Sequence, residues 1–309
     1  KMARLAVLFV MLVPAATASL LGFTGFQKDP KTTLVEFSPL TGKTSVVVNF
    51  DAVQGCLSGE RAYWAFHRAN TMLFGLTNGD GPVLIHDFAN NASWCAGEGA
   101  LEAYGWGLLY DGRSSPEQFI SFQSVWSSIS GAQYFGAGPS HLEGVKTNQS
   151  LVWSPEFEVQ HDSSSPALFC AAQYGGSGVA ALDAVTGNVF LFCGKLLTLS
   201  TAQKPWDLTH SVDLGPDLSP GPLAAGYSSH FKGVSVAFGF HNESGSAFGV
   251  ICPKTGVWLA GPISVHGGLL SGAAFDDSTS TWYGAAYSSA EVHVVDLITL
   301  SARLVKIEG

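Results

Sequence analysis

Charged residues are scarce in this sequence. Asp, Glu, Lys and Arg make up only 13% of the 309 residues, while hydrophobic residues make up 46%. So little charge with so much apolar surface is the opposite of a disordered composition. The formal net charge of −9 also argues against a nucleic-acid binder, because such proteins need an excess of Lys and Arg to neutralise phosphates.

Sequence motifs of common catalytic and metal sites are missing. The chain has no CxxC pair and no zinc-finger spacing of Cys and His, which argues against a structural zinc site. It has no P-loop, no HExxH, no dinucleotide fingerprint and no Gly-x-Ser-x-Gly elbow before a helix. We therefore assign no catalytic residue, no metal ligand and no cofactor from motifs, and expect a protein that is more binding module than enzyme.

Cysteine is present in an odd number. If the others are oxidised, at least one thiol is free or bridges to another chain. The alternative to an intramolecular disulfide is that the cysteines are small buried residues in strands. The five are Cys56, Cys95, Cys170, Cys193 and Cys252.

The N-terminal segment is apolar but short. Arg4 precedes the apolar run 5–13, and the small residues Ala16 and Ala18 follow. This order is typical of a secretory signal peptide, and it predicts cleavage after Ala18, a signal at 1–18 and an extracellular protein. The run is shorter than the roughly 20 residues of a membrane span. A buried core strand is the alternative.

Three N-glycosylation sequons agree with export. Each has the form Asn-x-Ser and lies in a turn-like context. They predict a secreted glycoprotein with glycans on Asn91, Asn148 and Asn242.

A short turn recurs along the rest of the chain. Runs of Val, Leu, Phe and Ala flank a stretch with Asp or Ser at its start and Thr-Gly at its end, as in 183–187. Asp or Ser can accept hydrogen bonds from backbone N–H groups, and Gly can adopt the positive φ that closes a hairpin. The equivalent points are Thr41, Asn90, Thr186, Thr255 and Thr299.

The upstream halves repeat as well, because 66–75 aligns without gaps on 275–284. Four antiparallel strands every roughly 40–50 residues is the period of a β-propeller blade. We predict an all-β chain with a single propeller domain at 19–309, most simply of six blades, with five or seven as alternatives and a β-sandwich as the competing fold. The predicted units are a partial first blade to Val48, then 55–97, 100–154, 156–198, 222–262 and 267–307, with an insertion at about 199–221.

The segment 179–190 resembles the repeat of quinoprotein-type propellers, and 255–258 echoes the same pattern. This resemblance implies the propeller architecture and no specific family. It carries no cofactor ligand across, and the Gly-His and Trp-Asp pairs of WD-repeat blades are absent.

Candidate binding residues come from the loops that join the second strand to the third and one blade to the next, because these loops share one propeller face. Their carboxylates could bind Ca²⁺ or orient a water molecule; solvated loop residues are the alternative. The candidates are Asp80, Glu98, Tyr174, Glu243, His266 and Glu291.

We therefore expect a secreted, non-enzymatic scaffold that binds protein or glycan partners or assembles with itself. The alternative is a secreted hydrolase or lyase with a metal-assisted site at the central channel. The first blade should lack its innermost strand. That strand could come from a rearranged C-terminal strand, from retained residues near 3–12, or from a neighbouring molecule.

Overall fold

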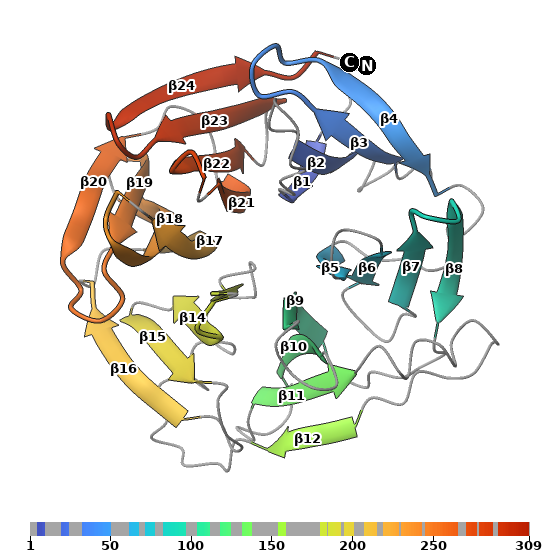
Figure 1. The fold of residues 1–309 in the computed structure, drawn as a ribbon, viewed down its shortest axis with the longest axis horizontal. Helices are drawn as coiled ribbons and strands as arrows, with labels where there is room; N and C mark the ends of the chain where they lie inside the picture. The colour runs from blue at the N-terminus through green and yellow to red at the C-terminus, as the bar shows by residue number, and fades with distance from the viewer. Residues whose placement is uncertain are drawn as a thin grey trace. The chain divides into compact units, whose positions relative to one another are not determined.

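The regular structure is entirely β-strand in the part of the chain that the computed structural model describes (Figure 1). Its strands form six four-stranded sheets whose recorded pairings are antiparallel, so the prediction of a six-bladed β-propeller fold is confirmed. The described residues are 5–9, 20–24, 33–50, 62–67, 72–77, 83–96, 104–111, 118–124, 132–137, 154–158, 180–183, 185–192, 195–200, 207–214, 219–228, 230–242, 245–264, 270–276, 278–286 and 290–308.

Two compact units divide the chain. Unit 1 spans 1–50, 177–199 and 208–309, and unit 2 spans 51–176 and 200–207. The sheets of unit 2 are β5 (Ala62–His67), β6 (Met72–Thr77), β7 (Val83–Asp87) and β8 (Ala92–Ala96), followed by β9 (Tyr104–Asp111), β10 (Gln118–Ser124), β11 (Ala132–Ala137) and β12 (Ser154–Glu158).

The other four sheets belong to unit 1, apart from the Ser200 and Asp207 ends of two strands. The first is β1 (Leu5–Phe9), β2 (Leu20–Thr24), β3 (Thr33–Phe37) and β4 (Thr44–Asn49), and the second is β13 (Ala180–Leu182), β14 (Asn188–Phe192), β15 (Lys195–Ser200) and β16 (Asp207–Asp213). The third is β17 (Ser219–Ser228), β18 (Gly233–Asn242), β19 (Gly245–Ile251) and β20 (Trp258–Ser264), and the last is β21 (Leu270–Asp276), β22 (Thr281–Ala286), β23 (Glu291–Asp296) and β24 (Ser301–Lys306).

One blade begins later than the sequence repeat predicts. The sheet β13–β16 spans 180–213, whereas the predicted unit was 156–198. Strand β16 lies within the segment 199–221, where an insertion was expected. As a result, the turn at Thr186 joins the first two strands of its sheet, while the turns at Thr41 and Thr255 join the last two.

In the described part of the chain, the same five-residue turn closes seven hairpins. Its first residue offers a side-chain or backbone acceptor to the N–H groups that follow, and its fifth residue has a positive φ, as at Gly187, where φ is 72°. The first residues are Ser38, Asp87, Asp183, Ser228, Cys252, Asp276 and Asp296. The fifth residues are Gly42, Asn91, Gly187, Lys232, Gly256, Ser280 and Leu300. Because these turns join strands one and two or strands three and four, they lie at the same end of every sheet that contains one.

Successive sheets of unit 1 pack face to face through apolar side chains. Phe190 and Leu196 contact Leu223 and Ile251 across the β13–β16 and β17–β20 sheets. In the next interface, Phe248 lies against Trp282, with ring centroids 4.4 Å apart. Burial of alternating apolar residues on both faces is what positions the strand ends of neighbouring blades.

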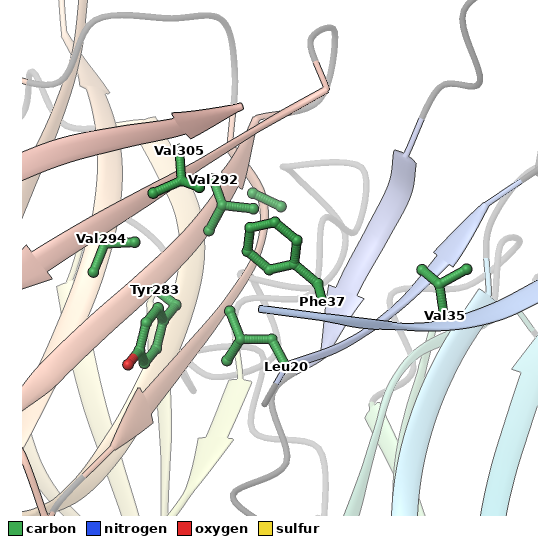
Figure 2. Close-up of a cluster of buried hydrophobic side chains, with 8 residues drawn as sticks. Leu20, Val35, Phe37, Tyr283, Val292, Val294 and Val305 are labelled. Carbon is green, nitrogen blue, oxygen red and sulfur yellow. The ribbon is translucent and has the colours of Figure 1, made fainter. Parts of the chain in front are cut away.

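The first and last sheets meet in the same way. Leu20 and Phe37 pack against Tyr283 and Val292, all buried (Figure 2). Beyond β24, Glu308 forms a parallel bridge with Lys43, the residue before β4, and the Glu308 N–H donates to the Gly42 carbonyl at 2.8 Å. We call this junction, formed by Pro39, Gly42, Thr44, Arg303 and Glu308, the closure seam.

The innermost strand of the first blade is β1. Residues Leu5–Phe9 pair with β2, and β1 also contacts β21 and β22 of the last sheet. Of the three sources expected for this strand, the structure uses the N-terminal residues of the chain itself. Cleavage of residues 1–18 stays a prediction, as does a single domain over 19–309.

Candidate functional site

Five of the six predicted binding residues lie outside the described residues: Asp80, Glu98, Tyr174, Glu243 and His266. Glu291 is described. It begins β23, is half-buried and lies opposite Lys306 of β24 in register. Within the described ranges, no group of three or more His, Cys, Asp or Glu side chains is placed to hold a metal ion.

The predicted modification sites have mixed coverage. Asn91 is exposed in the turn between β7 and β8, with a φ of 49°. Asn242 ends β18, while Asn148 lies outside the described residues. Cys252 is a free thiol, so any disulfide would have to pair other cysteines.

A set of exposed apolar side chains does emerge at the turn end of unit 1. Of the nine large hydrophobic residues that are exposed in the described part of the chain, five lie in or directly after the five-residue turns. We call these five residues the turn rim, and each of the four sheets of unit 1 contributes at least one. The turn rim consists of Leu40, Val185, Val257, Ile298 and Leu300.

The turn from Asp296 to Leu300 shows how the backbone fixes these side chains. The Asp296 carboxylate accepts the N–H of Ile298 at 2.8 Å and that of Thr299 at 3.1 Å. The pKa of Asp296 is lowered, chiefly by the hydrogen bond from the Thr299 N–H. The Ile298 N–H, the Thr299 hydroxyl and the nearby His230 add to this effect, so the carboxylate stays ionised. Leu297 is buried, and its N–H donates to the Ser280 carbonyl of the neighbouring turn. Ile298 and Leu300 therefore project from a rigid loop.

The other turns hold their apolar residues in a similar way. The Val185 N–H donates to the Asp183 carboxylate at 3.1 Å, and Val185 is 71% exposed. The Val257 carbonyl accepts the Cys252 N–H at 2.9 Å. Leu40 follows Pro39, whose carbonyl accepts a hydrogen bond from the Arg303 guanidinium at 3.0 Å.

Leu300 occupies a backbone conformation that its side chain disfavours. Its φ is 56°, and a left-handed residue other than Gly or Asn costs about 1–2 kcal/mol. Three of the equivalent turns use glycine here, at Gly42, Gly187 and Gly256, and the other three use Asn91, Lys232 and Ser280. Leu300 is nevertheless 46% exposed, so its burial does not compensate fully for this cost.

Chemically, the turn rim offers apolar contact area on a preorganised backbone. Single exposed hydrophobic residues are ordinary on protein surfaces. Their recurrence at one end of every sheet of unit 1 is the informative feature. The sequence carried a signal for it, namely an apolar residue in the third turn position at Leu40, Val185 and Ile298.

No family model matches the sequence, and no curated protein matches it. The described residues contain no helix long and apolar enough to cross a membrane.

Solved structures resemble the chain in fold. The periplasmic gluconolactonase of Pseudomonas aeruginosa has a TM-score of 0.63 and 13% identity, covering 98% of this chain and 85% of that one. A putative 6-phosphogluconolactonase from Bacteroides fragilis has a TM-score of 0.58 and 10% identity, covering 98% and 83%. A chain of a nidogen/laminin complex has a TM-score of 0.54 and 11% identity, covering 99% and 94%. At these identities the likeness shows the propeller fold alone.

Proposed function

We propose that this chain is an exported, glycosylated, non-enzymatic β-propeller scaffold that binds a protein partner on its turn rim. The observation that carries the proposal is the rim itself, with exposed apolar residues on four sheets and at one end of each. A partner that covers these side chains would bury apolar area at low entropic cost, because the turns are already ordered.

Two further features support a binding role. Leu300 keeps a disfavoured φ of 56° while exposed, as expected where a side chain is retained for contact rather than for stability. In addition, one of the similar chains was solved in a complex of nidogen and laminin, so a propeller of this kind can present a protein-binding surface.

Site-specific photo-crosslinking tests the proposal. A photoreactive amino acid replaces Ile298 on the turn rim, and in a matched variant it replaces Ser264, which is exposed at the opposite end of its sheet. After incubation with the medium of the cells that produce the protein, we expect a discrete protein adduct at Ile298 and none at Ser264. Equal labelling of both positions, or adducts at neither, would contradict a partner on the rim.

The second candidate is a hydrolase, which the two lactonase-like structures favour. The purified protein is assayed with a gluconolactone, once with added Ca²⁺ and once with a chelator. We expect no hydrolysis above the uncatalysed rate in either condition. Metal-dependent turnover that is lost in Glu291→Gln would replace the scaffold proposal with the enzyme.

A further inference from the structure

The innermost position of the first blade is filled by a strand that is unlike its counterparts. Ten residues separate β1 from β2, whereas β17 and β21 are each joined to the next strand by four residues. Strand β1 lies at the edge of its sheet, paired on one side with β2. It also belongs to the segment that the sequence predicts to be removed on export.

The surface that receives β1 is apolar and preformed by the rest of the chain. Leu20 and Leu21 of β2 are 0% and 7% exposed. Leu20 packs into the cluster that joins the first and last sheets, next to Phe37 and Tyr283 (Figure 2). Along its other edge, β2 pairs with β3, with Leu20 opposite Phe37 and Thr24 opposite Thr33. The position of this surface therefore does not depend on β1.

The register of β1 defines what the position accepts. Leu5 lies opposite Thr24 and Phe9 opposite Leu21, antiparallel, with one irregularity between Leu5 and Val7. The five residues of β1 are Leu-Ala-Val-Leu-Phe, all apolar. An extended apolar segment of about five residues therefore completes the sheet, whichever polypeptide supplies it.

We propose that the inner edge of β2 is a strand-acceptor site: once residues 1–18 are cleaved, it takes an apolar extended segment from another polypeptide, antiparallel to β2. An empty edge would leave those N–H and C=O groups of 21–24 that face β1 without their sheet partners, which is costly wherever water cannot replace them; the others bond to β3. Strand addition supplies those hydrogen bonds while side-chain pockets give selectivity. This inference rests on the export and cleavage part of the proposed function and is independent of the turn rim.

The test keeps the full chain through folding. A recognition sequence for a site-specific protease is inserted between Ala15 and Ala16, and the folded protein is cut. A fluorescent peptide with residues 1–15 of this chain is the probe. The control peptide carries Val7→Pro and Leu8→Pro; because N–H groups alternate along a strand, one of the two prolines removes a donor that faces β2.

We expect native mass spectrometry to find the cut segment held non-covalently or exchanged for the probe. The probe should bind cut protein at least ten-fold more tightly than uncut protein, and the control peptide should bind at least ten-fold more weakly than the probe. Loss of the segment without uptake of the probe and without a fall in Tm would overturn the acceptor site, as would equal binding of both peptides.

The N-terminal sequence of the secreted protein separates this inference from its premise. A chain beginning at Ser19 would leave β2 in need of a strand. A chain that retains Leu5–Phe9 would overturn the trans-acting role, while crosslinking at Ile298 would be unaffected.

Discussion

Replacing Gly42 by alanine should weaken the closure seam. Gly42 has a φ of 78°, and a Cβ atom there would lie 2.3 Å from the Lys306 carbonyl oxygen. That oxygen belongs to the backbone, so it cannot rotate away as a side chain would. The first and last sheets would have to shift apart at this point.

The magnitude follows from three contributions. The left-handed conformation costs alanine about 1–2 kcal/mol, and the stiffer unfolded chain returns about 0.5–1 kcal/mol. A shift also weakens the hydrogen bonds that Glu308 makes with Gly42 and Thr44, each worth about 1 kcal/mol. The free energy of unfolding should therefore fall by about 2–3 kcal/mol, which lowers Tm by about 3–5 °C in a chain of this size.

Differential scanning calorimetry provides the assay, and Gly233→Ala is the matched control. A Cβ atom at Gly233 would meet nothing within 4 Å, so this variant should unfold within about 1 °C of the original protein. If Gly42→Ala unfolds at the same temperature as Gly233→Ala, the closure seam does not contribute to stability.

Three further changes test the turns and the buried histidine. Leu300→Gly should raise the stability by about 0.5–1 kcal/mol, seen as a higher urea midpoint, because glycine relieves the positive φ at a small entropic cost; a lower midpoint would show that Leu300 packs more than its exposure suggests. Burial of the Cys252 thiol raises its pKa, but hydrogen bonds from Thr255 and Lys254 outweigh that effect and hold the pKa below the usual range. Alkylation of Cys252, followed by peptide mass spectrometry, should therefore reach its half-maximal rate at a lower pH in the original protein than in Thr255→Val. Burial lowers the pKa of His86, and the nearby charge of Asp87 opposes this shift only in part. As the pH falls below about 6.5, the histidine of the unfolded chain therefore takes up a proton before that of the folded chain, so acid should destabilise the original protein more than His86→Gln. Urea titrations of both proteins at about pH 7 and about pH 5.5 measure this difference, and an equal pH dependence in the two would contradict it.

The hairpins could be predicted from sequence because their turn chemistry is local. An acceptor at Asp183 and a glycine at Gly187 lie close enough in the chain to determine the turn by themselves, and the structure confirms both roles. The sequence alignment of 66–75 with 275–284 is also confirmed, because the two segments lie in the first hairpins of their sheets, β5–β6 and β21–β22.

The position of each hairpin within its blade could not be read in the same way. The turn at Thr186 has the composition of the turns at Thr41 and Thr255, yet it joins a different pair of strands. The residues of a turn do not show whether it joins the first two or the last two strands of its sheet, because that depends on how the strands pack against the neighbouring sheets. The predicted blade at 156–198 was therefore displaced from the observed sheet.

The turn rim escaped the sequence analysis for a related reason. An apolar residue between an acceptor and a threonine looks like a core residue, and its exposure depends on how the sheets pack. Leu297 and Ile298 illustrate this, since they are adjacent and chemically alike, but the first is 1% exposed and the second 50%. The predicted loop carboxylates, apart from Glu291, lie outside the described residues, so that set stays a prediction.

The closure seam has a mechanical consequence. In the described residues no strand of the first sheet is shared with the last, and the two are joined by side-chain packing and by the bonds around Glu308. A pulling force applied through β2 and β24 would load this junction before it loaded the ladders inside either sheet. When stretched in this way, the molecule should yield there first and lengthen while its individual sheets remain intact.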